Sequence, residues 1–408
     1  MKGIHLAAAM ATVLSFSRPA LALTGTIAVT TTANSDTTSD GRCALVEAMK
    51  AANGTGTYHE CSAIGSGALT ITIPSTSQPI SSSAALAPNK PLVISGAGLT
   101  ATTINFTANT SSGCGVLAVN GANLDLRNLT LQQSSGLTLT GICGQTTTGT
   151  GPVITLAGVR VRSFQNSGVM MSAGDVQGTN VIIQNNHTFL SGGGIAILDG
   201  AQMETFTNLS LIGNFADGSG GGLYRTRLSS GNGNIYNGTI SGNQAGIGGG
   251  IFAGAGNPYL EVHFTTIVSN TAFDKGGGIY VDTDCHGGTA FEIFDSVVAS
   301  NDAQYAGPNF YAECYGFALS TRTLWGGASD QYMGNINSLG GDKTIIQDTV
   351  GTVFSSLSNT GAPYFLPAYP PRSTSDARNM AACGSTADVR GVSRPQGPGC
   401  DSGAWEVP

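Results

Sequence analysis

The sequence predicts an all-β protein built as a parallel β-helix, a fold in which the chain winds in stacked coils of short strands. Three observations support this prediction. Glycine triplets end at a constant interval, at Gly194, Gly222, Gly250 and Gly278. A column of asparagines recurs with nearly the same period, at Asn186, Asn214, Asn243, Asn270 and Asn301. The runs between these markers alternate apolar and polar residues with the period of two that strands require.

The length of the repeat favours this fold over other repeat architectures. Three short strands and three turns occupy about 25 to 30 residues, which is one coil of a parallel β-helix. A helical solenoid needs long stretches with an apolar period of about 3.6 residues. A β-propeller, the main alternative, needs four strands and about 40 residues for each blade. The repeat in this sequence, about 28 residues for each coil, is too short for a blade.

The segment 1–22 has the features of a signal peptide. Lys2 gives a positively charged start, residues 4–16 form an apolar core, and residues 20–22 (Ala-Leu-Ala) form a small-residue cleavage site. We therefore expect an exported protein, secreted or associated with the cell surface. No other run approaches the roughly 18 apolar residues of a membrane helix, so we expect no membrane span.

The eight cysteines suit an oxidising compartment, and the repeat predicts how they pair. Cys114 and Cys143 are separated by about one repeat, and Cys285 and Cys314 are separated by the same interval. Residues one coil apart lie at the strand spacing of about 4.8 Å, which is within the range of a disulfide. We therefore predict that each of these two pairs joins neighbouring coils. The other cysteines are predicted to pair locally, Cys43 with Cys61 and Cys383 with Cys400.

The two ends of such a coil need covers, because open strand edges invite aggregation. Leu45, Val46, Met49 and Ala52 form one apolar stripe that stops at Asn53, which predicts a capping helix. We expect four parts in the chain: a signal peptide (1–22), a cap with the first rungs (23–95), the parallel β-helix (96–345) and an end domain tied by a disulfide (346–408).

Two segments resemble known bacterial sequence motifs. Residues 30–53 are similar to the N-terminal motif of the CSLREA-type surface and secreted proteins, with matches at Asp40-Gly41, Cys43, Leu45, Glu47-Ala48 and Ala52-Asn53. Residues 357–406 resemble the choice-of-anchor Q end domain, with matches at Asn359, Gly361, Pro363, Cys383, Asp388, Arg390-Gly391, Arg394-Pro395, Cys400-Asp401, Gly403-Ala404 and Glu406. The Gly-Gly-Gly-Ile elements are also similar to the repeats of polymorphic outer-membrane adhesins.

This resemblance implies a right-handed parallel β-helix exported by a bacterium. It implies little chemistry, because most relatives have no assigned activity. Relatives often carry a sorting tail after this end domain, whereas the present sequence stops at Pro408, so we expect a freely secreted product. Arg390, Arg394, Asp401 and Glu406 match the end-domain motif and are expected to hold that domain together by charge-assisted hydrogen bonds.

The composition excludes several classes of protein. Charged residues make up 10% of the 408 residues, and the formal net charge is −7. Nucleic-acid binding needs a basic face, so no nucleic-acid partner is expected. The five histidines form no HxH or HxxxH cluster, and no metal site is predicted. The sequence also lacks a nucleophile elbow, a P-loop and a Rossmann fingerprint.

Alignment on the glycine triplets places Tyr224, Phe252 and Tyr280 in one column, and the next interval, taken from Asn270 to Asn301, adds Tyr311. If the preceding aliphatic residues point inward, the period of two sends these rings outward. A row of exposed rings could stack along a glycan, because aromatic faces bind the apolar faces of sugars. Alternatively, the rings stack on one another and seal the turn.

The same alignment sets Glu313 one coil above Asp282, with Asp284 nearby. Carboxyl pairs on neighbouring rungs suit glycoside hydrolysis. A β-helix lyase would instead combine Ca²⁺-binding acids with a basic residue, for which Lys275, Arg225 and Arg227 are the nearby candidates. The plain alternative is a solvated acidic turn beside a disulfide.

The sequence therefore leaves two functions open. The favoured one is an adhesin-like protein that binds a polysaccharide or another cell surface through its ring column. The alternative is an extracellular polysaccharide lyase or glycoside hydrolase that uses Asp282, Asp284 and Glu313. We expect a monomer without a cofactor. If the acids bind an ion, Ca²⁺ is the one that they would suit.

Overall fold

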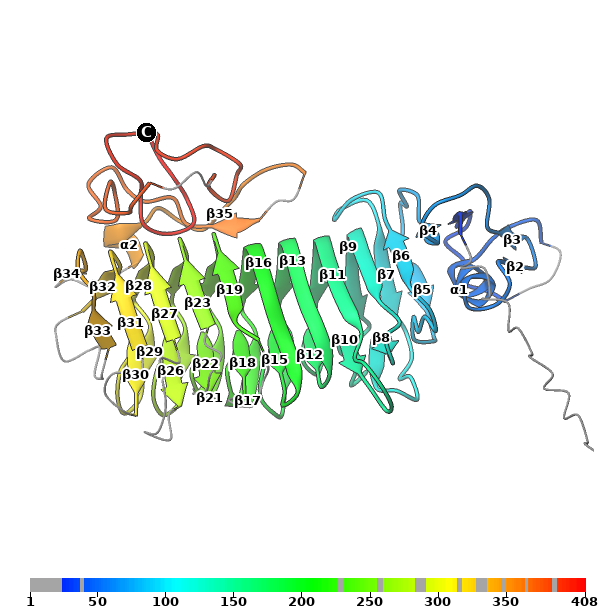
Figure 1. Cartoon of the computed structure of the whole chain (residues 1–408), viewed down its shortest axis with the longest axis horizontal. Coiled ribbons are helices and arrows are strands. Elements are labelled where there is room, and N and C mark those ends of the chain that lie inside the picture. Colours follow the sequence, from blue (N-terminus) through cyan, green and yellow to red (C-terminus); the bar gives the residue numbers. More distant parts are fainter. Residues whose placement is uncertain are drawn as a thin grey trace, which may run out of the picture.

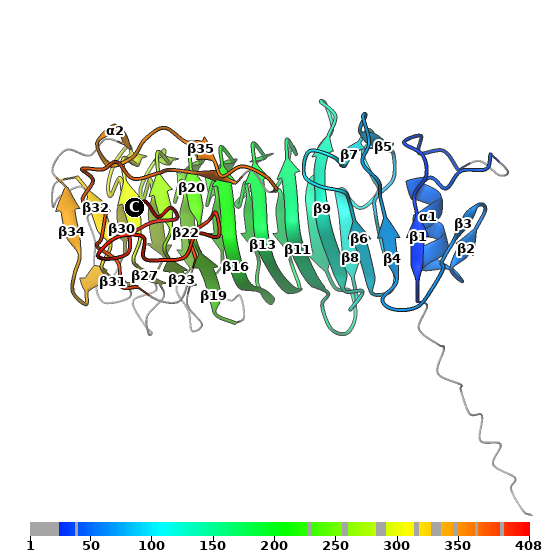
Figure 2. The ribbon, with the colours of Figure 1, turned by 90° about the horizontal axis from the view of Figure 1, so that it is seen from above.

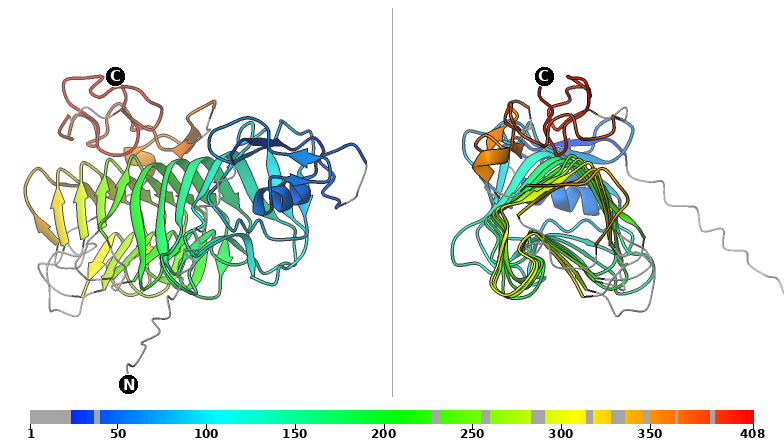
Figure 3. Two further views of the ribbon diagram at one scale, coloured as in Figure 1. Left: turned by 45° about the vertical axis from the view of Figure 1, so that its right-hand side comes forward. Right: turned by 90° about the vertical axis from the view of Figure 1, so that its left-hand side faces the viewer.

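The computed structural model describes residues 24–36, 40–226, 231–254, 260–282, 291–313, 318–327, 336–345, 350–363, 366–383 and 387–408. Within these ranges the chain winds into stacked coils, and the predicted parallel β-helix is confirmed (Figure 1). Viewed along its axis, the coils superimpose (Figure 3). The expected signal peptide lies outside the described residues. No helix in the described ranges is long and apolar enough to cross a membrane.

The described strands form three parallel sheets along the coil. The long sheet contains β1 (Thr26–Ala28), β4 (Thr70–Thr72), β5 (Ile80–Ser82), β6 (Leu92–Ser95), β7 (Thr103–Phe106), β9 (Leu124–Gln133), β11 (Val153–Arg162), β13 (Gly174–Gln184), β16 (Ala201–Ile212), β19 (Gly233–Tyr236), β20 (Thr239–Ser241), β23 (Leu260–His263), β24 (Thr266–Val268), β27 (Phe291–Phe294), β28 (Val297–Ala299), β31 (Ala318–Thr321), β32 (Leu324–Gly326), β33 (Ile336–Ser338) and β34 (Lys343–Ile345).

The two other parallel sheets complete each coil. The eight-stranded sheet contains β8 (Cys114–Val119), β10 (Thr140–Gln145), β12 (Val169–Met171), β15 (Ile195–Ile197), β18 (Leu223–Arg225), β22 (Ile251–Gly254), β26 (Ile279–Asp282) and β30 (Phe310–Ala312). The five-stranded sheet contains β14 (His187–Thr188), β17 (Phe215–Ser219), β21 (Gln244–Ile247), β25 (Thr271–Ala272) and β29 (Asp302–Ala303). Two antiparallel pairs lie outside the coil, β2 (Thr57–Tyr58) with β3 (Cys61–Ser62) and β35 (Ser358–Asn359) with β36 (Pro367–Ala368).

The glycine triplets recur because each triplet packs against the triplet of the next coil. The first glycine adopts a left-handed backbone conformation, with φ of 68° at Gly220, which glycine reaches without a steric cost. The third glycine lies against the neighbouring backbone. A Cβ atom on Gly222 would lie 2.5 Å from the carbonyl oxygen of Gly250 and 3.2 Å from Nδ2 of Asn243. A side chain at this position would therefore push the coils apart.

The asparagine column forms a buried hydrogen-bonded ladder. Nδ2 of each asparagine donates to Oδ1 of the next one at 2.9 to 3.0 Å, along Asn186, Asn214, Asn243, Asn270 and Asn301. The same oxygen also accepts the backbone N–H of the preceding ladder residue, as Asn243 Oδ1 does from Asn214 at 2.9 Å. The ladder continues to Asn309, which occupies the place of the third triplet glycine and accepts from Asn301 at 2.9 Å. Sequence reasoning missed this last member.

The N-terminal end is covered by the predicted capping helix, α1 (Leu45–Asn53). Leu45, Met49 and Ala52 are buried, whereas Val46 is only half-buried. Oε2 of Glu47 accepts the backbone N–H of Ala44 at 2.9 Å, which stabilises the first turn. Figure 2 shows this helix at the end of the coil, next to β1 and β4.

Three of the four predicted disulfides are present in the described residues. Cys43 pairs with Cys61 beside the cap, and Cys383 pairs with Cys400 in the end domain. The third bridge joins neighbouring coils, Cys114 to Cys143. Cys285 and Cys314 lie outside the described residues, so that pairing stays a prediction.

The end domain, which comprises α2 (Val350–Val353), β35, β36 and the segments up to residue 408, lies along the side of the β-helix, across the outer face of the long sheet (Figures 1 and 2). Its centre is an ion pair between Arg394 and Glu406, 2.8 Å apart, with both side chains fully buried. The Arg394 guanidinium also lies 4.5 Å from the ring centre of Phe264 on the β-helix. Asp295 of the β-helix accepts the backbone N–H of Ala382 at 2.9 Å.

We expect replacement of Asn243 by alanine to destabilise the protein by about 2 to 4 kcal/mol, because each buried polar group left without a partner costs about 1 to 3 kcal/mol. Asn243 is fully buried and takes part in hydrogen bonds to Asn214, Leu211 and Asn270. Urea unfolding measures the change. Asn105→Ala is the control, since Asn105 bonds to Ser134 on the outer face. An equal loss of stability in both variants would show that the buried ladder contributes no more than a hydrogen bond on the outer face.

Candidate functional site

The predicted ring column exists as a continuous stack on the eight-stranded sheet, which we call the first aromatic stack. Tyr224, Phe252, Tyr280 and Tyr311 align in register on β18, β22, β26 and β30. Their ring centres are 5.0, 5.4 and 5.4 Å apart, and the planes are tilted by 29°, 9° and 16°. Leu223, the neighbour of Tyr224, is fully buried on the opposite face of the strand, in the core.

The expectation that all four rings are exposed is wrong for the two central ones. Phe252 and Tyr280 are only 8% and 5% exposed, because each is sandwiched between the rings of the coils on either side. The rings therefore stack on one another, as in the alternative that the sequence left open. Tyr224 and Tyr311, at the two ends of the stack, are half-buried.

The predicted acids lie at the hydroxyl edge of this stack. Asp282 and Glu313 follow the register pair Val281 and Ala312, so they occupy neighbouring rungs. The Tyr280 hydroxyl donates to Oε1 of Glu313 at 2.5 Å. Burial, and then this carboxylate, raises the pKa of the Tyr280 hydroxyl far above its usual value. Asp284 lies outside the described residues.

The basic residues named with these acids have other positions. Arg225 is almost completely buried, and burial lowers its pKa to about 10, so the side chain stays protonated at neutral pH and does not suit the role of a base. Lys275 places its Nζ 4.9 Å from the ring centre of Tyr311. Arg227 lies outside the described residues.

A pocket opens where the first aromatic stack ends. The rung next to Tyr224 carries Ala196, and the rung after that carries Met170. A pocket of about 470 Å³ runs from Tyr224 across the neighbouring rungs to Cys114, and Ala196 is buried at its base. We call it the Tyr224 pocket. Its polar lining consists of hydroxyl and amide side chains, among them Thr140, Asn166, Thr188 and Ser191.

The surroundings of the Tyr224 pocket carry negative charge, although its own lining does not. None of the described residues that line it is charged. Acids lie nearby, since burial and then the carboxylates of Asp199 and Asp282 raise the pKa of the Tyr224 hydroxyl. Such surroundings favour neutral over anionic ligands.

A second aromatic stack, which sequence reasoning missed, lies on the outer face of the long sheet. Tyr236, His263 and Phe294 align on β19, β23 and β27, with ring centres 4.6 and 4.7 Å apart and planes within 14°. The signal was present in the sequence. These residues recur at the same intervals as the asparagine column from Asn243 to Asn301.

A carboxyl pair lies beside the second aromatic stack. Glu261 and Glu292 are register partners on β23 and β27, so their backbones are about 4.8 Å apart. Oε2 of Glu261 lies 3.0 Å from Nε2 of His263. Burial, and then the charge of Glu261, raises the pKa of Glu292. A carboxyl group with a raised pKa suits the role of a general acid.

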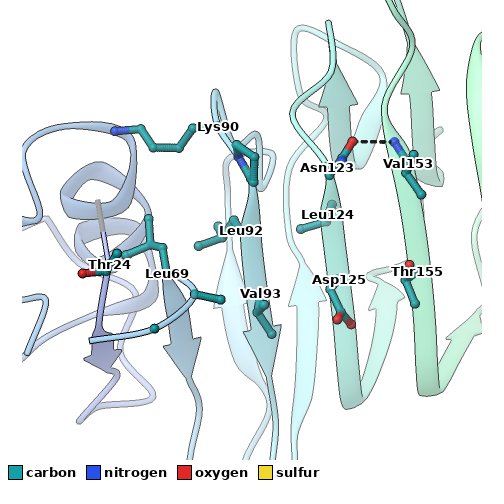
Figure 4. A pocket seen from close by; sticks show the side chains of 13 residues that line it. Thr24, Leu69, Lys90, Leu92, Val93, Asn123, Leu124, Asp125, Val153 and Thr155 are labelled. Atoms are coloured by element: carbon teal, nitrogen blue, oxygen red, sulfur yellow. Dashed lines mark hydrogen bonds between the residues drawn. The ribbon is translucent and has the colours of Figure 1, made fainter. Parts of the chain in front are cut away.

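Two further features near the N-terminal end are less suited to a ligand. A groove of about 420 Å³ crosses β4, β6, β9 and β11 (Figure 4). Two of its polar side chains are used locally: Asn123 accepts the N–H of Val153 at 2.9 Å, and Lys90 donates to Gly54 at 2.8 Å.

Among the described residues, one cluster has the spacing of metal ligands, namely Asp36, Glu47 and His59 in the cap. Its members already have protein partners. His59 Nδ1 lies 3.0 Å from Oε1 of Glu47, and Asp36 pairs with Lys50. The cluster therefore acts as a link between α1 and the neighbouring turns.

Comparison with known proteins adds one similarity. No family model matches the chain, and no curated protein matches it. Among solved structures, the chain is similar to the crystal structure of pectate lyase Pel9A, with a TM-score of 0.55 and 11% sequence identity. The match covers 90% of this chain and 92% of that chain. At this identity the similarity shows the fold, and this protein is an elongated member of the parallel β-helix class.

We expect Glu292→Gln to stabilise the protein at neutral pH. A raised pKa means that the folded state binds more protons than the unfolded state, so the wild type loses stability as the pH rises from the unfolded value of about 4.3 through the folded value. Glutamine does not titrate. Urea unfolding of both proteins at pH 4 and pH 7.5 should show a difference that favours the variant and grows with pH. A constant difference would contradict the raised pKa.

Proposed function

We propose that this is an exported protein that binds a neutral polysaccharide, with one sugar ring in the Tyr224 pocket. The observation that carries the proposal is the pocket that borders Tyr224, the last ring of the first aromatic stack. Phe252 and Tyr280 have rings on both sides, but Tyr224 has only Ala196 on its other side. A sugar ring bound in this pocket would contact the end of the stack.

The lining of the Tyr224 pocket supports a sugar as the occupant. An apolar sugar face suits the ring of Tyr224 and the side chains of Met170 and Leu198, while sugar hydroxyls suit the hydroxyl and amide groups of the lining. The similar solved structure is a pectate lyase. Pectate is an anionic polymer, however, and the carboxylates of Asp199, Asp282 and Glu313 near this face argue for a neutral glycan here.

The disulfides support a location outside the cell. Three bridges are formed among the described residues, and one of them, Cys114 to Cys143, joins two coils of the β-helix. Such bonds persist in oxidising compartments. We infer an adhesin-like, secreted or surface-associated protein, in agreement with the bacterial resemblance of its N-terminal and C-terminal segments.

Ala196→Phe should fill the Tyr224 pocket and lower the affinity for neutral oligosaccharides by about tenfold or more, since the loss of one stacked ring costs about 1 kcal/mol and the new side chain also occupies the site. The Cβ of Ala196 faces Gly192 as the Cβ of Tyr224 faces Gly220, so the new ring should extend the stack. Isothermal titration calorimetry with neutral and uronic-acid oligosaccharides measures the change.

The matched control is Ala157→Phe, which adds the same side chain to the outer face of the long sheet, away from the Tyr224 pocket. A companion pair is Tyr224→Ala, which should weaken binding, and Tyr224→Phe, which keeps the ring and should not. Unchanged binding in Ala196→Phe, or tighter binding of uronic-acid than of neutral chains, would refute the proposal.

Glycan cleavage is the second candidate function, and the carboxyl pair of Glu261 and Glu292 favours it. Retaining glycosidases place two carboxyl groups about 5 to 5.5 Å apart, which neighbouring rungs can provide. Glu292, with the raised pKa, would donate the proton to the leaving group, and Glu261 would act as the nucleophile. Asp282 and Glu313 offer the same rung spacing. In both pairs one acid has a partner, Glu313 with the Tyr280 hydroxyl and Glu261 with His263, and the raised pKa of Glu292 distinguishes the second pair.

If the protein cleaves glycans, Glu261→Gln and Glu292→Gln should each lower the release of reducing ends by about a hundredfold or more. Asp282→Asn is the matched variant at the other acid pair and should retain activity. The measurement is reducing-end release from a panel of neutral and uronic-acid polysaccharides. A loss confined to Asp282→Asn would move the reaction to the first aromatic stack, and no turnover by the wild type would leave binding as the function.

A further inference from the structure

The second aromatic stack also ends at a rung with a small side chain. Tyr236 stacks on His263 on one side, and the rung on its other side carries Thr207, followed by Thr179. A cavity of about 400 Å³ lies at this end and includes both Tyr236 and Thr207 in its lining. We call it the Tyr236 pocket. Its outer wall comes from the end domain, through Ala387, Asp388 and Gly391.

We propose that the Tyr236 pocket is a second binding site for a neutral saccharide, in which a sugar ring stacks on Tyr236. The ligand class is that of the proposed function, but the residues, the sheet and the wall from the end domain are different. Each site can therefore be tested, and can fail, without the other.

A fixed amide side chain lines this pocket. Asn237 lines the Tyr236 pocket and is only 5% exposed. Its Nδ2 donates to the carbonyl oxygen of Ala387 at 2.9 Å and lies 3.3 Å from Oδ1 of Asn208, which fixes the orientation of the amide. Its Oδ1 is buried and has no hydrogen-bond donor among the described residues. Because Nδ2 bonds to Asn208 on the Thr207 rung, Oδ1 faces the opposite rung, and the amide serves as a fixed wall of the pocket.

The remaining lining is consistent with a sugar. Thr205, Thr207 and Asn208 contribute hydroxyl and amide groups from β16. None of the described residues that line the pocket is a cation, Asp388 belongs to the lining, and the charge of Glu261 acts on the Tyr236 hydroxyl. Asp388 is itself paired with Arg390, so it does not need a cationic ligand. An anionic uronate is therefore disfavoured, and a neutral sugar ring is favoured.

The end domain forms this site by folding back along the β-helix. Ser210 donates to the carbonyl oxygen of Pro367 at 3.3 Å, and the Ser241 hydroxyl lies 3.0 Å from that of Tyr369. Together with the bond from Asn237 to Ala387, these contacts hold the domain against the outer face of the long sheet. The outer face of the long sheet thus forms the base of the Tyr236 pocket, Tyr236 forms one side, and the end domain forms the outer side.

The test uses one substitution at two adjacent rungs. Thr207→Tyr places a ring directly on Tyr236, fills the pocket and should lower the affinity for neutral oligosaccharides by about tenfold or more. Thr179→Tyr places the same ring one rung further away, about 9.6 Å from Tyr236 at strand spacing. This leaves room for one sugar ring between the two side chains, so the affinity should stay the same or increase.

Both variants are made in the full-length disulfide-bonded protein that carries Ala196→Phe, so that calorimetry reports the Tyr236 pocket alone. Tyr236→Ala, which should lose binding, and Tyr236→Phe, which should keep it, test the same pocket if Thr207→Tyr fails to fold. The proposal is overturned if the Ala196→Phe background binds no neutral oligosaccharide. It is also overturned if Thr207→Tyr binds as well as its parent, or if Thr179→Tyr loses as much affinity as Thr207→Tyr.

Discussion

The part of the β-helix from Asn186 to Asn309 depends on the buried asparagine ladder, because it fixes the register of each of these coils on the next. An amide has a donor and an acceptor at opposite corners, so a column of asparagines can bond along the axis of the β-helix from one coil to the next. Each ladder member also bonds to the backbone, as Asn243 does with Leu211 and Asn214. A coil that slipped by one residue would lose all of these bonds and would turn its aliphatic side chains outward. Insertions are therefore confined to the loops between ladder positions.

The fixed register has a consequence for the surface. Side chains at equivalent positions stack at the strand spacing, so a run of aromatic residues becomes a continuous stack. A pocket forms beside the last ring of such a stack, where the column continues with a smaller residue. Both candidate binding pockets arise in this way, one at Ala196 beside Tyr224 and the other at Thr207 beside Tyr236. In each case the ring that ends the stack has one face without an aromatic neighbour.

The end domain covers part of the long sheet and completes one of its pockets. The ion pair of Arg394 and Glu406 is buried and shielded from water, so it organises the irregular chain around it instead of forming a charged surface. Further hydrogen bonds to Glu406 come from the backbone of Asp401 and Gln396. This compact unit then lies on the β-helix, where it covers part of one sheet and supplies the outer wall of the Tyr236 pocket.

The sequence by itself determined the coil, the length of the repeat, the asparagine column, the capping helix and the partners of three disulfides, because these features repeat at a spacing or follow local rules that can be read along the chain. It also placed Tyr224, Phe252, Tyr280 and Tyr311 in one stack. The tertiary structure decided how much of each ring is covered, since that depends on neighbouring coils. It also decided where the end domain lies, since Asn237 and Ala387 are far apart in the chain and no periodicity connects them.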